Sequence, residues 1–193
     1  HICHIFQIEF IEPIVFKLIF DKIVSFLILL FLSPVLIIIA TATFFVDGLP
    51  ITYSARRVGF KGKIFYIYKF RSMTRNSSRV LGTWGLFIRK TNLDELLQFV
   101  NVIKGDMSII GPRPHDELED IYFNDHIEQY HLRRQVRPGI TGLSAIRGNR
   151  GGTDLDIIRQ RVEYDLEYIK NKNFFLDIKI FIKTIVIVFK PNH

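Results

Sequence analysis

The sequence predicts a mainly helical α+β protein with a small β-hairpin and an apolar segment toward each end. Three observations lead to this prediction. Residues 23–46 (IVSFLILLFLSPVLIIIATATFFV) contain no charged residue, and Phe, Ile and Val dominate residues 173–190. Apolar residues alternate on both sides of Gly59–Gly62, as in two paired strands. Several segments of the middle region place apolar residues at i, i+3, i+4 and i+7, the spacing of amphipathic helices.

The composition indicates an anionic partner and a membrane. The chain of 193 residues is long enough for one domain with a core plus an appendage. It carries 26 Lys+Arg against 19 Asp+Glu, a net charge of +7, which favours nucleic acid, an anionic membrane or a phosphorylated substrate. The 48% of hydrophobic residues, 18 of them Phe, favour the membrane. We expect no nucleic-acid partner, because the chain has no binding motif and its positive charge is spread out.

The first residues carry little information on function. Cys3 is the one cysteine, which excludes an intramolecular disulfide and indicates a reducing compartment. Residues 1–4 (HICH) resemble part of a metal site, but no further ligands follow at useful spacing. Because the chain starts with His rather than Met, we expect a fragment or a processed product of a longer protein.

The uncharged stretch from Ile23 to Val46 could cross a bilayer as one helix, at about 1.5 Å per residue. Pro34 lies near its middle and has no N–H to donate to the carbonyl of Leu30, so the helix must bend or break there. Lysines and arginines flank the stretch on both sides, as expected of two cytoplasmic flanks. A hairpin that enters one leaflet and returns fits both facts, with the Ser33 hydroxyl serving backbone groups freed at the break. A kinked spanning helix fits the residues equally well.

The other predicted elements follow in chain order. We expect a hairpin turn at 59–62, a loop at 76–78, and one helix over 92–104 with Thr91 or Asn92 as N-cap and Gly105 after its end. A helix over 116–132 and a shaped loop at 137–142 (RPGITG) come next. Thr153 would cap a helix with the apolar stripe Leu155, Ile158, Val162, Leu166 and Ile169. Residues 173–190 suit an interfacial helix with snorkelling lysines, the alternative being a buried strand or core helix.

Two adjacent acids, Asp94 and Glu95, stand in the first turn of the 92–104 helix. Their ordinary interpretation is that they complement the positive helix N-terminus. The setting suggests chemistry as well. Arg89 and Arg113 are near in sequence and could clamp phosphate oxygens, and the prolines on both sides of Arg113 stiffen its backbone. An ionised carboxylate can attack phosphorus, usually with Mg²⁺ to offset the charge of the substrate. The spacing alone does not specify the reaction.

Several motifs in order resemble the bacterial sugar transferase family, the monotopic polyprenyl-phosphate phosphoglycosyl transferases. They are KFRSM (69–73), LDELLQFVNVIKGDMSIIGPRP (93–114), RPGITG (137–142) and GNRGGT…RVEYDLEYI…LDIKI, and the resemblance runs from about Phe20 to Lys183. Within the family, the chain is most similar to undecaprenyl-phosphate glucose phosphotransferases of exopolysaccharide assembly. The resemblance implies transfer of sugar 1-phosphate from a UDP-sugar to undecaprenyl phosphate, with Mg²⁺ and release of UMP, at the cytoplasmic face of the bacterial inner membrane.

The resemblance also implies roles for single residues. The Asp-Glu dyad of the family falls on Asp94, the expected nucleophile that forms an aspartyl phospho-sugar, and on Glu95, expected to support it by metal contact or acid–base help. Both would be metal ligands. The Ser-Pro break of the family falls on Ser33-Pro34, which favours the re-entrant hairpin. We therefore expect a tail and membrane hairpin over residues 1–46 and a cytoplasmic catalytic domain with a C-terminal amphipathic helix over residues 47–193. The expected substrate-binding residues are Lys69, Arg71, Arg89, Arg113, Arg137 and Arg147.

The sequence departs from the family at three places. Many relatives carry Gln at Ala55, Pro at Leu97, and Trp-Ala-Gln in place of residues 143–145 (LSA). Amide side chains at these places could donate hydrogen bonds to substrate, so their loss puts the choice of donor sugar in doubt. Because the Asp-Glu dyad and the GPRP motif remain, we still expect activity. A membrane-attached module that binds anionic lipid or polymer without catalysis is the alternative function. The sequence does not decide whether the chain forms a homo-oligomer.

Overall fold

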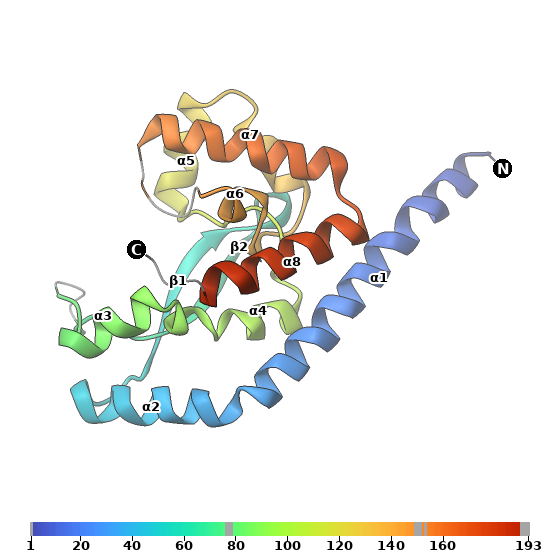
Figure 1. The fold of residues 1–193 in the computed structure, drawn as a ribbon. Helices are drawn as coiled ribbons and strands as arrows, with labels where there is room; N and C mark the ends of the chain where they lie inside the picture. Colours follow the sequence, from blue (N-terminus) through green and yellow to red (C-terminus); the bar gives the residue numbers. More distant parts are fainter. Residues whose placement is uncertain (1, 76–78, 149–151, 153, 190–193) are drawn as a thin grey trace.

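The computed structural model describes residues 2–75, 79–148, 152 and 154–189. In them, a bent pair of apolar helices leads into a β-hairpin and then into a series of further helices (Figure 1). The helices are α1 (Ile2–Phe31), α2 (Ser33–Asp47), α3 (Gly82–Lys90), α4 (Gln98–Lys104), α5 (Glu117–His126), α6 (Leu143–Ile146), α7 (Leu155–Asn171) and α8 (Phe174–Phe189). The strands are β1 (Thr52–Val58), β2 (Ile64–Phe70), β3 (Ser108–Ile110) and β4 (Gly139–Thr141). Short 3₁₀ turns are η1 (Phe60–Gly62), η2 (Leu93–Glu95) and η3 (Tyr130–Gln135). The predicted mainly helical α+β class is confirmed.

The apolar N-terminal segment is bent by 63° at a break between Phe31 and Ser33. Pro34 stands in the first turn of α2, where its missing N–H costs nothing. None of the described helices is long and apolar enough to cross a bilayer by itself, whereas Val15–Phe31 and Ser33–Asp47 together are, as a broken span or a re-entrant loop. The N-cap residue of α2 is Leu32, which makes no side-chain capping hydrogen bond, and the predicted role of the Ser33 hydroxyl at the break stays a prediction. Large apolar side chains cover the pair, with Phe31 84% and Phe45 81% exposed.

The predicted β-hairpin is confirmed. Strands β1 and β2 pair antiparallel from Thr52↔Phe70 to Val58↔Ile64, around the turn that the two glycines indicated. Lys61 and Gly62 both take positive φ in this turn, at 54° and 76°, which glycine accepts without steric cost. Phe65 and Ile67 point from β2 into the core, so the hairpin presents its other face outward.

A parallel pair of three-residue strands, β3 and β4, lies in the core beside α8. Residues 137–142 are therefore not only a loop, as predicted, because Gly139–Thr141 form β4. The backbones approach unusually closely here: a Cβ on Gly139 would lie 2.1 Å from the amide nitrogen of Gly111. Glycine at both positions is what lets this pairing form. The same contact fixes the chain just before Arg113.

Two predicted helices are interrupted. The predicted helix over 92–104 is a 3₁₀ turn at 93–95 followed by α4, and neither Thr91 nor Asn92 caps it with its side chain. Asn92 instead takes the left-handed conformation, with φ 56°, while Gly105 ends α4 as predicted, with φ 88°. In a 3₁₀ turn, residues three apart lie on the same side, as they nearly do in an α-helix. The apolar spacing of residues 93–100 therefore resembled that of one continuous helix.

The predicted helix over 116–132 is shorter than expected. It begins with a capping box formed by Asp116 and Glu119 and ends at His126. The chain then leaves the helix, yet Phe123, Ile127 and Tyr130 are all buried in one apolar cluster with Ile158 and Val162 of α7. Their spacing of four and three residues imitates a continued helix, although the backbone turns at Gln129, with φ 61°.

The two C-terminal helices confirm the predicted apolar patterns. The stripe on α7 is buried at Ile158 and Val162, and Asp154 caps its first turn; Thr153, the predicted cap, and the predicted loop at 76–78 lie outside the described residues. Residues 174–189 form one helix, α8, rather than a strand. Its Ile180 is fully buried, whereas Phe175 is 81% and Val186 59% exposed. Helix α8 is therefore apolar both toward the core and toward its surroundings.

Candidate functional site

The acid pair lies in the 3₁₀ turn η2, which packs against β2 and α3. This turn projects two adjacent side chains in different directions, because successive residues point about 100° to 120° apart around a helical axis. Asp94 is 8% exposed and Glu95 is half-buried. The two carboxylates consequently meet different surroundings.

Glu95 accepts hydrogen bonds from two cations. Lys69 Nζ lies 2.7 Å from its Oε1, and Arg113 Nη2 lies 2.9 Å from the same oxygen. Arg113 Nη1 is 3.4 Å from Oε2, so the guanidinium fork spans both oxygens. Burial alone would raise the pKa of Glu95, but the charges of Arg113 and Lys69 outweigh it and lower this pKa to about 2. Glu95 is therefore ionised at every physiological pH.

Asp94 has the opposite character. Burial, and next the negative charge of Glu95, raise the pKa of Asp94 to about 6, against a smaller lowering by Lys69 and Arg89. Among the described residues, no side chain donates a hydrogen bond to its carboxylate. Two neighbouring acids with pKa values pushed apart are the arrangement by which active sites give similar groups different tasks.

The hairpin and α4 together place Lys69. Asn101 of α4 is fully buried, accepts a hydrogen bond from the backbone N–H of Tyr68 at 3.0 Å, and donates one to the carbonyl of Tyr66 at 2.7 Å. These two bonds fix β2 against α4, the helix that follows the acid pair. Lys69 is the next residue on β2 and therefore reaches Glu95.

A buried ion pair holds the backbone of Arg113. Arg133 Nε donates to Asp165 Oδ2 at 2.7 Å, and its Nη2 donates to the carbonyl oxygen of Arg113 at 2.8 Å. Its Nη1 lies 3.2 Å from Nδ1 of His115. Burial, and next the charge of Arg133, lower the pKa of His115 to about 2. His115 is therefore neutral. The hydrogen bond from Arg133 to the Arg113 carbonyl holds the backbone of Arg113 in place.

Asp165→Asn should lower the free energy of unfolding by about 3 kcal/mol, because it leaves the buried guanidinium of Arg133 without its counter-charge. The exposed pair of Asp156 and Arg159 on the same helix provides the control, since Asp156→Asn should change stability by less than about 1 kcal/mol. Chemical denaturation in detergent, followed by circular dichroism, measures both. Equal stability of the two variants would contradict a clamping role for Asp165.

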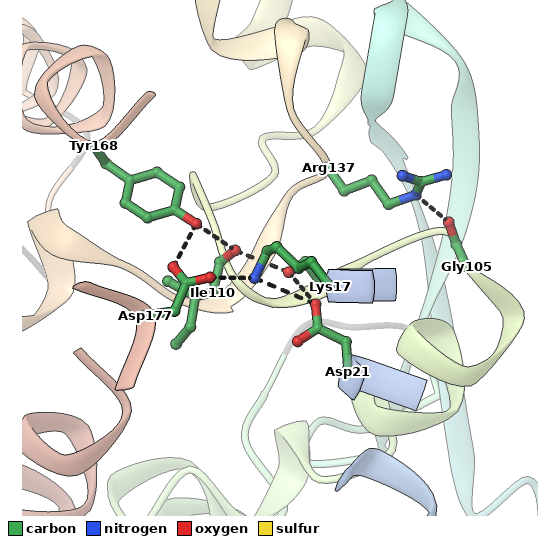
Figure 2. A network of polar contacts seen from close by, with 8 residues as sticks. Lys17, Asp21, Gly105, Ile110, Arg137, Tyr168 and Asp177 are labelled. Carbon is green, nitrogen blue, oxygen red and sulfur yellow. Dashed lines mark hydrogen bonds and ion pairs between the residues drawn. The ribbon is translucent and has the colours of Figure 1, made fainter. Parts of the chain in front are cut away.

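Of the six predicted substrate residues, the structure brings Lys69, Arg89 and Arg113 to the acid pair and places three elsewhere. Arg71 is buried and donates to the Asp47 carboxylate and to the carbonyls of Gly48 and Pro50, which joins the end of α2 to β2. Arg137 donates to the carbonyl of Gly105 at 2.9 Å (Figure 2). Arg147 pairs with Glu167 at 2.5 and 2.7 Å. Direct substrate contacts of these three arginines stay predictions.

Two residues that matter to this site were missed by the sequence analysis, although a signal existed. Asn101 follows Leu97 by four residues, so it lies on the apolar side of its segment. Asp165 follows Ile158 by seven and Val162 by three, on the apolar stripe of α7. A polar residue in an apolar stripe must find a partner or lose stability, so each position marked a buried hydrogen-bonding group.

The acid pair suits a metal shared with substrate better than a dedicated metal cage. Among the described residues there is no cluster of three or more His, Cys, Asp or Glu side chains. Mg²⁺ is commonly held by only one or two carboxylates, with water and substrate phosphates completing its six ligands. Asp94 and Glu95 match that smaller set of ligands. No side chain among the described residues donates a hydrogen bond to the Asp94 carboxylate.

Comparison with known proteins shows which family the chain resembles over most of its length. The family model of the bacterial sugar transferases matches residues 13–191. The chain is 44% identical over 184 residues to a UDP-glucose:undecaprenyl-phosphate glucose-1-phosphate transferase of Klebsiella pneumoniae, covering 89% of this chain and 39% of the relative. It is 39% identical to an undecaprenyl-phosphate galactose phosphotransferase of Salmonella typhimurium (90% and 40% covered) and 34% identical to the exopolysaccharide production protein PSS of Rhizobium leguminosarum (90% and 94% covered).

The match covers nearly the whole of this chain but only part of several relatives. The chain spans about two fifths of the length of the first curated relatives it matches. The matched region contains the apolar helix pair from residue 13 onward, the acid pair and the residues that surround it. This chain belongs to the bacterial sugar transferase family.

Proposed function

We propose that this chain transfers sugar 1-phosphate from a UDP-sugar to undecaprenyl phosphate and releases UMP, as a first membrane step of exopolysaccharide assembly. One observation carries the proposal. A buried Asp94, whose carboxylate accepts no hydrogen bond from a described side chain, lies beside Glu95, which binds the cations Lys69 and Arg113. The activities in the names of the relatives support the same reaction class, with UDP-glucose as the first donor to test.

In the proposed reaction Asp94 attacks the phosphorus that bears the sugar. A carboxylate oxygen forms a bond to this phosphorus, the bond to the bridging diphosphate oxygen breaks, and UMP leaves with the electron pair. An oxygen of undecaprenyl phosphate then attacks the same phosphorus, and the aspartyl–phosphorus bond breaks. The products are the lipid diphosphate sugar and a regenerated Asp94 carboxylate.

Lys69, Arg89 and Arg113 stabilise the charge of the diphosphate in this scheme. The site presents three cations around two carboxylates, and cations positioned in advance around the phosphate oxygens are the main source of catalysis in phosphoryl transfer. Glu95 is a poor proton carrier because the pKa of its carboxyl is about 2. We therefore assign it the task of holding Lys69 and Arg113 in place and, together with Asp94, of binding Mg²⁺. When bound, Mg²⁺ neutralises charge on the diphosphate.

The apolar surfaces of α1, α2 and α8 fit a chain that meets its lipid acceptor at a membrane. We propose that α1 and α2 enter one leaflet as a re-entrant hairpin and that α8 lies at the interface, with the acid pair on the cytoplasmic side. The 63° bend and the basic residues on both flanks support this arrangement.

The direct test measures UMP release from UDP-glucose by the purified chain, with undecaprenyl phosphate and Mg²⁺, against a panel of other UDP-sugars. We expect UMP release that depends on the acceptor lipid over many turnovers, and a radiolabelled sugar phosphate trapped on the protein when the lipid is omitted. A chain that binds the lipid but forms no adduct and releases no UMP would be the non-catalytic module.

The rate of UMP release should fall about tenfold per pH unit below pH 6 and level off above it, because only ionised Asp94 can attack. The ordinary pKa of 3.8 would place this fall two units lower. In Glu95→Gln the inflection should move to lower pH, since the charge of Glu95 helps to raise the pKa of Asp94. A single-turnover pH profile, with circular dichroism at each pH, measures this; an inflection unmoved by Glu95→Gln would contradict it.

A further inference from the structure

A buried polar network joins the apolar helix α1 to the catalytic part of the chain (Figure 2). Lys17 Nζ lies 2.7 Å from Asp177 Oδ2 on α8 and 3.5 Å from Asp21 Oδ2, one turn along α1. Asp21 accepts a hydrogen bond from Ser108 Oγ of β3 at 2.5 Å. Tyr168 of α7 donates to Asp177 Oδ1 at 2.8 Å. Helix α1, strand β3 and the consecutive helices α7 and α8 thus meet at one small polar centre.

Three members of this network are buried, whereas the side chains of Lys17 and Asp177 are 31% and 15% exposed at its edge. Asp21 is 4%, Ser108 3% and Tyr168 2% exposed. Burial, and next the charge of Asp177, raise the pKa of the Tyr168 hydroxyl, which therefore stays protonated and donates. Well-packed apolar residues would hold two elements together at least as firmly as buried charges do. What buried charges add is a single register, because any shift of the helix leaves a charge without its partner.

The register of α1 is passed to the catalytic residues along two short routes. Ser108 begins β3, and β3 leads through Gly111 and Pro112 directly to Arg113, which contacts Glu95. Helix α1 also packs along α4, which follows the turn that carries Asp94. Both sides of the site are therefore built on strands and helices that contact α1.

We propose that Asp21 and Ser108 are positioning residues, which fix the height of the catalytic centre above the bilayer by fixing the register of α1 against β3. This inference rests on the proposed function. The donor is water-soluble, and the cations proposed to bind it, Lys69, Arg89 and Arg113, lie outside α1 and α2. The acceptor phosphate, in contrast, lies at the depth that the membrane sets, so an error in height affects the lipid step.

The test compares two acceptors with the purified chain in nanodiscs: membrane-embedded undecaprenyl phosphate and a short-chain, water-soluble polyprenyl phosphate. Asp21→Leu and Ser108→Ala should each lower kcat/KM for undecaprenyl phosphate at least tenfold. The KM for UDP-glucose and the kcat/KM for the short-chain acceptor should stay within threefold of the wild-type values. The loss in the double variant should be smaller than the two single losses combined, because both changes remove the hydrogen bond between Ser108 and Asp21.

Two further variants separate positioning from folding. Ser25 lies on the same helix, is fully buried, and its hydroxyl has no hydrogen-bond partner among the described residues, so Ser25→Ala should change neither acceptor reaction. Ser108→Thr keeps the hydroxyl and should restore most of the lipid reaction. Equal losses with both acceptors, or no loss with either, would overturn the positioning role. A wild-type chain that uses neither acceptor overturns the proposed function itself, and this inference with it.

Discussion

Asp94→Asn should reduce UMP release from UDP-glucose by at least about 10³-fold, because the amide cannot form the bond to phosphorus on which the proposed reaction depends. The substitution changes the shape of the buried site little, since Asn is nearly isosteric with Asp. It also abolishes the labelled adduct, which the wild-type chain should form without lipid. A stopped assay of UMP at pH 8, together with autoradiography of the denatured protein, measures both losses.

The same variant should be more stable than the wild type. The pKa of Asp94 is raised from 3.8 to about 6 in the folded chain, so keeping Asp94 ionised there costs at most about 3 kcal/mol at pH 8. Asn cannot ionise, and the gain should therefore be present above pH 6 and fade as the pH falls toward 4. A higher thermal midpoint with lost activity shows that the loss is chemical. Normal turnover by a well-folded Asp94→Asn would exclude Asp94 as the nucleophile.

The large periodic elements could be predicted from the sequence, because burial of an apolar face dominates their stability. The hairpin around Gly59–Gly62, the stripe of α7 and the break at Pro34 each depend on a local signal, and each is present. The failures came where tertiary contacts override local spacing. Asn92 and Gln129 both take the left-handed conformation. Asn adopts it more often than most residues but not as a rule, and Gln gives no such signal.

The candidate site was predictable in its members but not in its contacts. The acid pair and Arg113 stood close together in the sequence, whereas Lys69 reaches Glu95 only because Asn101 fastens β2 to α4. Arg71 shares a short motif with Lys69, yet it lies just past the end of β2 and binds the end of α2. Residues two positions apart share one face of a strand only while the strand continues. The point where β2 ends is set by the fold.

Glu95→Gln should produce the second largest effect, a fall of at least about 10²-fold in turnover. The carboxylate of Glu95 forms ion pairs with Lys69 at 2.7 Å and with Arg113 at 2.9 Å. A neutral amide at this position removes both ion pairs, so the two cations are no longer held beside Asp94. Removing a group that preorganises charge stabilisation commonly costs about 10² to 10³ in rate. Glu117→Gln, which breaks an exposed pair with Arg56, provides a matched control that should keep its turnover.

Binding of UDP without Mg²⁺ should change in the opposite direction. In the wild type the Glu95 carboxylate occupies the same donors of Lys69 and Arg113 that a phosphate oxygen would use, so the nucleotide must displace it. In Glu95→Gln this competition is absent, and titration calorimetry should show UDP bound about tenfold more tightly while turnover is lost. Adding Arg113→Gln should cancel the gain. If Glu95→Gln weakens UDP binding in the absence of metal, Glu95 does not compete with phosphate, and its pairing with the two cations serves the fold alone.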